Sequence, residues 1–269
     1  LISFESVHGL DVPAAGLTED GRHGISSDIM QHGCIKCNQL AQAVELMRQY
    51  LELMKSKGEL LEVHRRVNPK HELAAVTAAA QRRWNKPILF HDVMGTKLPV
   101  LTNIYGSRER LAGILGIDPD NFCKEWSNLA SIAGARDMPT AVPSAEPIDY
   151  VDCALSDLPL ITYSERDAAP YFTSAMFLAK DPDTGIQNLS FHRSMYVSDQ
   201  ELRCRLAPKH HLTIYHEKAE QRGEALPAAM LIGPPPTTFL TAAAPLPYDA
   251  DEMEVAAQLQ GAPIPMRRC

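Results

Sequence analysis

The sequence predicts an α+β protein in which an N-terminal unit of alternating helices and strands precedes a β-rich domain of barrel or sandwich type. Between residues 39 and 138, helical periodicity alternates with short apolar runs, as in a mixed α/β unit. Prolines at 139, 143, 147, 159 and 170 then interrupt any long helix. Beyond residue 170, short β-prone runs separated by turns dominate. We therefore divide the chain into an unassigned segment expected to be disordered (1–38), an α/β domain (39–138), a proline-rich connector along the surface (139–170) and a β-rich domain (171–269).

The N-terminal unit begins with a strongly periodic helix. Apolar residues recur at steps of four and three from Leu40 to Met54, which places them on one helical face, and Gly58 is suited to end the helix. The further predicted elements are a strand in 59–67, an alanine-rich helix over 71–83, strands in 86–93 and 98–106, and helices over 107–117 and 121–134, the last with Asn121 as its N-cap.

The second half of the chain contains four short β-prone runs, at residues 171–181, 188–197, 203–207 and 227–233. Helices are predicted over 210–222 and 249–261. The GPPP run at 233–236 reads as a rigid turn, because proline lacks the N–H donors of a phosphate-binding loop.

Composition excludes several classes of protein. Hydrophobic residues make up 45% of the 269 residues, and the net charge of −7 argues against a nucleic-acid-binding surface. No apolar run reaches the roughly 20 residues that a membrane helix needs, and the N-terminus resembles no signal peptide, so we expect a cytoplasmic protein. The six cysteines are scattered, and Cys34 and Cys37 have the spacing of half a zinc site with no second half.

The stretch DPDTGIQNLSFHRSMYV, residues 181–197, places polar side chains in a strand that should be half-buried. Asn188, His211 and Glu252 could together offer oxygen and nitrogen donors suited to Mn²⁺ or Mg²⁺, although many other combinations exist. Arg193 could clamp a carboxylate or phosphate, or it could form an ordinary surface ion pair. The residues alone leave these alternatives open.

Ordered motifs narrow the choice. The series begins with MRQYLEL and continues with YFTSAMFLAKDPDTGIQNLSFHRSMYV. After it come, in order, the histidine-bearing LAPKHHLTIYH, PAAMLIGPPP and APLPYDADEMEV. This order resembles the UbiD family of decarboxylases from about residue 44 onward. The resemblance implies an N-terminal α/β domain, a split β-barrel that binds flavin, and a C-terminal domain that this chain lacks.

The resemblance also implies a function and its residues. UbiD enzymes use prenylated FMN, supplied by a flavin prenyltransferase of the UbiX type, for non-oxidative decarboxylation of aromatic or α,β-unsaturated acids such as hydroxybenzoates or polyprenylated hydroxybenzoates. The resemblance further implies bound Mn²⁺, with K⁺ as a further ion, and a homo-oligomer for the full-length protein. Carried over by motif, the metal ligands are Asn188, His211 and Glu252, and Arg193 is catalytic. The cofactor-binding set is Asn188, Leu189, Ser190, Phe191, His192, Arg193, His210, His211 and Glu252.

Several features qualify that expectation. Asn188 and Arg193, five residues apart, would face opposite sides of a regular strand, so a bulge or a strand end near Ser190 is predicted. His192 is at a position that varies in the family, so its role is open, and a packed core histidine is its alternative. The family's glutamate pair is expected beyond the Glu252 helix and is absent from this chain, so a catalytically inactive flavin-binding remnant is the alternative function, unless Glu165 or His192 replaces the acid. A flavin reductase on a split barrel is a third possibility.

Overall fold

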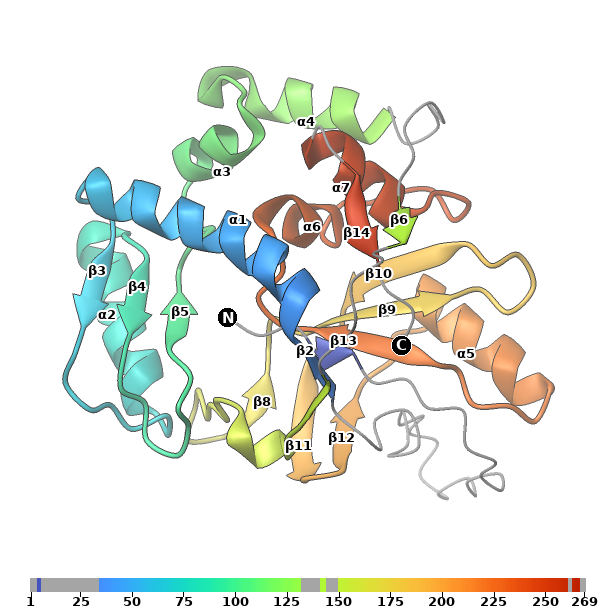
Figure 1. Ribbon diagram of the computed structural model, residues 1–269, viewed down its shortest axis with the longest axis horizontal. Helices are drawn as coiled ribbons and strands as arrows, with labels where there is room; N and C mark the ends of the chain where they lie inside the picture. The colour runs from blue at the N-terminus through green and yellow to red at the C-terminus, as the bar shows by residue number, and fades with distance from the viewer. Residues whose placement is uncertain (1–3, 6–33, 132–140, 144–149, 261–262, 267–269) are drawn as a thin grey trace.

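The N-terminal unit is a three-stranded sheet with one helix on each face (Figure 1). The computed structural model of the chain describes residues 4–5, 34–131, 141–143, 150–260 and 263–266. In this sheet the central strand is parallel to one neighbour and antiparallel to the other. Its elements are α1 (Cys37–Ser56), β3 (Leu61–Val63), α2 (Glu72–Trp84), β4 (Ile88–Phe90) and β5 (Val100–Thr102).

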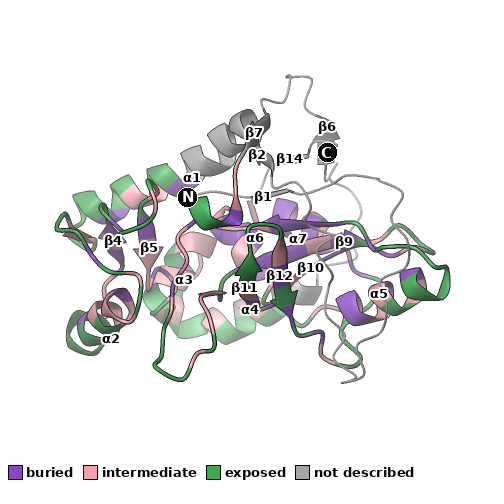
Figure 2. Ribbon diagram, turned by 90° about the horizontal axis from the view of Figure 1, so that it is seen from below, coloured by how far each residue is buried: buried purple, intermediate pink, exposed green. Residues whose placement is uncertain are grey.

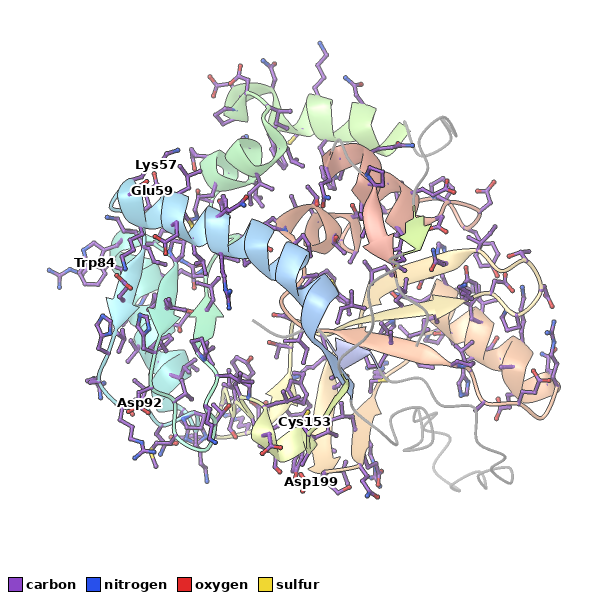
Figure 3. All side chains as sticks on the ribbon, in the orientation of Figure 1. Lys57, Glu59, Trp84, Asp92, Cys153 and Asp199 are labelled. Carbon is purple, nitrogen blue, oxygen red and sulfur yellow. The ribbon has the colours of Figure 1, made fainter. Side chains whose placement is uncertain are left out.

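Alternation along the strands explains why both faces are covered. Ile88 and Phe90 are buried with Leu73 of α2, whereas Leu101 of β5 packs against Met47 and Met54 of α1. The periodic helix predicted from Leu40 is confirmed, and it begins at Cys37. Figure 3 shows Trp84 projecting outward from the end of α2, where its side chain is half-exposed.

A short helical segment follows this sheet. It comprises α3 (Arg108–Leu115), the 3-10 turn η2 (Pro119–Asn121) and α4 (Phe122–Ser131). Ser107 caps α3 by accepting from the Arg110 backbone N–H. Asn121, the predicted cap of the next helix, is the last residue of η2, and its amide donates to Asp118, whose side chain also caps that turn.

Two further small sheets join segments that lie far apart along the chain. Strands β1 (Phe4–Glu5), β2 (Cys34–Lys36) and β7 (Tyr150–Asp152) form one, and β6 (Ala141–Pro143) pairs with β14 (Ile264–Met266) in the other. Cys34 therefore lies in a strand and Cys37 begins α1. Of the segment 1–38, which we expected to be disordered, residues 4–5 and 34–38 thus lie in β1, β2 and the start of α1, and the others lie outside the described residues.

The β-rich domain contains two three-stranded antiparallel sheets. Two of the predicted strands each divide between these sheets: residues 171–181 give β8 (Tyr171–Phe172) and β9 (Met176–Lys180), and residues 188–197 give β10 (Gln187–Phe191) and β11 (Ser194–Ser198). The remaining strands are β12 (Glu201–Cys204) and β13 (Ala228–Leu231), so that the orders are β10-β9-β13 and β12-β11-β8. Closure of these sheets into a split barrel stays a prediction.

The sheet β10-β9-β13 is packed on both faces, which fixes the position of two helices. Phe177 and Ala179 of β9 face α5 (His211–Gln221) in one core, and Met176 faces α7 (Glu252–Gln260) in another. Figure 2 shows buried residues along β9 and α7, while α2 is exposed on its outer side. The N-termini of α5 and α7 thus reach the edge strand β10 from opposite faces.

The proline-rich connector does not simply wrap the surface as predicted. Leu155, in the 3-10 turn η3 (Leu155–Asp157), and Leu158 are buried in the same core as β9 and α5. Asp199, labelled near Cys153 in Figure 3, accepts from the Ser156 backbone N–H at 3.1 Å and fastens this turn to the β11–β12 loop. Apolar residues between the prolines therefore anchor the connector.

One helix was not predicted. Helix α6 (Pro236–Thr241) begins at the last proline of the GPPP run. Proline is tolerated at the first helical position because that N–H has no intrahelical partner. No helix in the described part of the chain has the length and apolar character needed to cross a membrane.

Candidate functional site

A pocket of about 400 Å³ lies beside the edge strand β10, between the N-termini of α5 and α7. Its volume falls within the range of small-molecule and cofactor sites. Seven of the residues predicted from sequence line it: Asn188, Leu189, Ser190, Phe191, His210, His211 and Glu252. Lys209 and the segment after α6, namely Ala242, Ala244, Pro245 and Leu246, complete the wall.

Each wall element is held by local structure. Lys209 adopts a left-handed φ of 68°, which costs strain for a side-chain-bearing residue and turns the chain sharply into His210 and His211. On the opposite side, Asp251 accepts from the Met253 backbone N–H at 2.8 Å and so caps the start of α7. Asp251 also accepts from the Gln187 side chain at 3.2 Å, tying the start of α7 to β10.

The three predicted metal ligands converge in this pocket. Asn188 Nδ2 lies 2.8 Å from Glu252 Oε1 and 3.4 Å from His211 Nδ1. His211 Nδ1 and Glu252 Oε1 are 3.9 Å apart. Three side chains from β10, α5 and α7 therefore present their polar ends to one small volume, with the amide nitrogen of Asn188, not its oxygen, toward the other two.

The electrostatics of the pocket show an uncompensated acid. Glu252 is buried, and its carboxylate accepts from Asn188 and from the Leu189 backbone N–H but bonds to no Lys or Arg among the described residues. Burial raises the pKa of Glu252 from 4.5 to about 7, against these hydrogen bonds, which lower it. Burial, followed by repulsion from His210, lowers the pKa of His211. A cation at this point would remove the cost of ionising Glu252.

An ion pair with a buried carboxylate links the turn before β10 to α5. Asp181, in the turn between β9 and β10, accepts from Lys218 of α5 through both oxygens at 2.8 Å. Burial opposes ionisation of Asp181, but the bonds from Lys218, the Asp183 backbone and Tyr248 lower the pKa of the carboxyl below its ordinary value. Tyr248 donates to Asp181 at 2.9 Å and packs edge-on against the His211 ring. This network was missed from sequence, where only the DPDTG turn pointed to Asp181.

The break between β10 and β11 resolves the predicted conflict of strand faces. Strand β10 ends at Phe191, one residue beyond the predicted region of Ser190, and β11 begins at Ser194 in the other sheet. His192 and Arg193 lie in this break and do not line the pocket.

The Arg193 side chain lies on the outer side of that break. It donates to Asp167 at 2.8 Å, is half-exposed, and lies 3.8 Å over the Tyr171 ring. The structure therefore brings together the three predicted ligands and places Arg193 apart from them, so its catalytic role stays a prediction.

A second group of possible metal ligands lies in the N-terminal sheet. Glu62, His64 and His91 bring their ligand atoms within 4.8 Å of one another. The two imidazole rings are stacked 4.3 Å apart with an angle of only 11° between their planes, so one ion cannot lie in the plane of both. Glu62 is already paired with Lys55 at 3.1 Å. We therefore assign the candidate site to the pocket beside β10.

Comparison with known proteins places this fold and pocket in a family. The N-terminal domain of 3-octaprenyl-4-hydroxybenzoate carboxy-lyase, UbiD, matches residues 51–130, and its Rift-related domain matches residues 139–269. The chain belongs to the UbiD family of carboxy-lyases, as its motifs predict. The mixed α/β architecture agrees with these two domains.

Individual relatives are decarboxylases of different acids. The chain is 32% identical to the anhydromevalonate phosphate decarboxylase of Methanosarcina mazei over 82% of its length, and 30% identical to the phenolic acid decarboxylase of Escherichia coli O157:H7 over 83%. It matches the structure of an evolved dimeric form of the UbiD-class enzyme HmfF from Pelotomaculum thermopropionicum, in complex with prenylated FMN, with a TM-score of 0.72 and 31% identity, covering 82% of this chain and 52% of that one. The chain spans about half the length of the curated relatives it matches, 50% of each of the two named.

Proposed function

We propose that this chain forms the cofactor-binding part of a non-oxidative decarboxylase that acts on an aromatic or α,β-unsaturated carboxylic acid. In this proposal Asn188, His211 and Glu252 hold a divalent cation, Mn²⁺ in the first place, next to the phosphate of prenylated FMN. The buried Glu252 carboxylate carries the proposal, because among the described residues it bonds to no Lys or Arg and its nearest basic group is the His211 ring at 3.9 Å.

The donor set fits such a cation. Two oxygen-bearing side chains and one imidazole suit Mn²⁺ or Mg²⁺ better than a thiophilic metal. The N-terminus of α5 opens on the pocket through His210 and His211, and a helix N-terminus favours an anion such as a phosphate. A cation and a phosphate can therefore be neutralised together in this pocket.

The cofactor itself would supply an electron sink for the electrons released as CO₂ departs. The protein binds and orients it: residues 188–191 form one wall of the pocket, and the Phe191 ring is braced edge-on by Phe239 of α6 at 4.8 Å between centroids. Phe239 in turn stacks on Tyr105 of the N-terminal unit at 4.0 Å, which ties this wall to the other domain.

The substrate end of the proposal involves Arg193. Arg193 comes five positions after Asn188 and lies in the break that follows the end of β10 at Phe191. If prenylated FMN bound in the pocket reached this break, Arg193 would be the residue to hold the substrate carboxylate, for which its planar fork is suited. The relatives are named for different acids, from anhydromevalonate phosphate to phenolic acids.

The cation site can be tested without turnover. Mn²⁺ is titrated into the chain with FMN present, and free Mn²⁺ is followed by electron paramagnetic resonance. Wild type should bind one equivalent, Glu252→Gln should lose at least about tenfold in affinity through the loss of an anionic ligand, and Glu254→Gln on the same helix should match wild type. Equal binding by both variants would refute the site.

Release of CO₂ from a panel of aromatic and unsaturated acids, with prenylated FMN supplied, then tests the decarboxylase. Binding of Mn²⁺ and flavin without turnover would favour the alternative of a cofactor-binding chain that is inactive by itself.

A further inference from the structure

His192 is a buried polar side chain that the proposed function does not use. It is 4% exposed, follows the last residue of β10, and its ring meets Phe177 edge-on. Its Nε2 lies 2.9 Å from Ser190 Oγ, and the same Oγ lies 2.9 Å from Asn188 Oδ1. A chain of two hydrogen-bonding contacts therefore runs from His192 to a proposed ligand of the cation.

Few protons are available for the hydrogen-bonding contacts between His192, Ser190 and Asn188. Burial lowers the pKa of His192, so the ring is neutral near pH 7 and carries one N–H. An interaction with the Arg205 backbone raises this pKa, as an accepting carbonyl does, so we place the N–H on the ring nitrogen that does not face Ser190. Nε2 is therefore an acceptor, and the Ser190 hydroxyl holds the only proton available for the contact between them.

With one proton for its two contacts, the Ser190 hydroxyl can form a true hydrogen bond in only one of them. With Asn188 Oδ1 toward Ser190, two acceptors face a hydroxyl that has a single proton. Turning the amide by half a rotation satisfies both contacts, because Nδ2 then donates to Ser190 while Ser190 donates to His192. The turn also directs Oδ1 toward His211 and Glu252.

The two amide orientations suit different states of the pocket. Nδ2 facing Glu252 at 2.8 Å gains a hydrogen bond to the carboxylate when no cation lies between them. A hard cation instead requires the amide oxygen as its ligand. We propose that His192 is a positioning residue that, through Ser190, stabilises the orientation of Asn188 in which Oδ1 binds the cation. This inference rests on the proposed function of the pocket.

The inference gives His192→Phe and His192→Gln opposite outcomes. Phenylalanine fills the site but accepts nothing, so Ser190 would donate to Asn188 Oδ1 and hold the amide the wrong way round. Loss of a partner that orients a metal ligand typically costs about 10–100-fold in metal affinity, and we expect that loss for Mn²⁺. Glutamine can still accept from Ser190 and should remain close to wild type.

The double variant Ser190→Ala/His192→Phe separates orientation from packing. It removes the misdirecting hydroxyl, leaves the amide free to turn, and should recover the greater part of the affinity that His192→Phe loses. A histidine that acted only by packing would give a double variant at least as weak as the single one. His216→Phe, on α5 and outside the pocket, is the matched control, and unfolding midpoints establish that each variant is folded.

Mn²⁺ affinity in the presence of FMN is measured for all five proteins by the same resonance titration. A weak His192→Phe with near-normal His192→Gln and a recovered double variant supports the inference. Wild-type affinity in His192→Phe, or no recovery in the double variant, overturns it. Failure of wild type to bind Mn²⁺ would overturn the proposed cation site and this inference with it.

Discussion

Replacing Glu252 by glutamine should change how the stability of the metal-free protein depends on pH. In the folded protein burial raises the pKa of this carboxyl from 4.5 to about 7. The folded state therefore holds a proton between these values that the unfolded chain releases, so unfolding becomes easier as pH rises. The contribution of that proton is fully present below pH 4.5 and is lost as pH rises through 7.

The magnitude follows from the size of the shift. A difference of about 2.5 pKa units corresponds to about 3 kcal/mol of unfolding free energy. Glutamine resembles the protonated acid and does not titrate, so the stability of Glu252→Gln relative to wild type should rise by about 3 kcal/mol between pH 4.5 and 8. His192 and His211, whose pKa values are lowered, titrate with the opposite sign, but they are present in both proteins and largely cancel in the difference.

Urea unfolding with a chelator present, at intervals from pH 5 to 8, measures this difference directly. Glu254→Gln serves as the control, since its difference from wild type should stay constant. A difference between Glu252→Gln and wild type that does not change with pH would refute the reasoning, because the carboxyl would then titrate normally in the folded protein. Excess Mn²⁺ should stabilise wild type and have little effect on Glu252→Gln.

Two other changes test the surroundings of the pocket. Arg193→Lys should alter the unfolding free energy by less than about 1 kcal/mol, because the Arg193 side chain that pairs with Asp167 and covers the Tyr171 ring is half-exposed. It should nevertheless abolish most CO₂ release by the whole enzyme, because lysine lacks the planar fork, and near-normal turnover would contradict the proposed role of Arg193. Asp181→Asn should cost roughly 3 kcal/mol in urea unfolding by breaking a buried pair, whereas Asp183→Asn, which also removes a bond to Lys218 but at an exposed position, should cost less than about 1 kcal/mol. Equal losses in these two variants would show that burial does not decide the effect.

Sequence periodicity predicted the helices of this chain better than its sheets. The helices predicted over 71–83 and 210–222 agree with α2 and α5 within one residue at each end, because one apolar face repeats along each of them. The strand predictions were too long, since a run of alternating residues does not reveal where the chain passes from one sheet to another. That passage occurs at residues 173–175 and again at His192–Arg193.

The candidate site could be named from sequence only through its family motifs. Asn188, His211 and Glu252 are brought together by sheet and helix packing, which no spacing rule encodes. Lys209, Tyr248 and the buried pair of Asp181 with Lys218 were missed because their roles depend on a backbone conformation or a long-range contact. Helix α6 was missed because three prolines were taken as a turn, although proline is compatible with a first helical position.

The wide separation of the three ligands along the chain has a consequence for the order of folding. The contact between Asn188 and Glu252 spans 64 residues, and the one between Asn188 and His211 spans 23. Closing the longer loop costs more chain entropy, so α7 should dock onto β10 after α5 has done so. A cation that binds all three side chains would contribute its binding free energy to this last step. Metal binding would then complete the last step of folding. Before the ion is bound, backbone hydrogen exchange should be fastest at the start of α7.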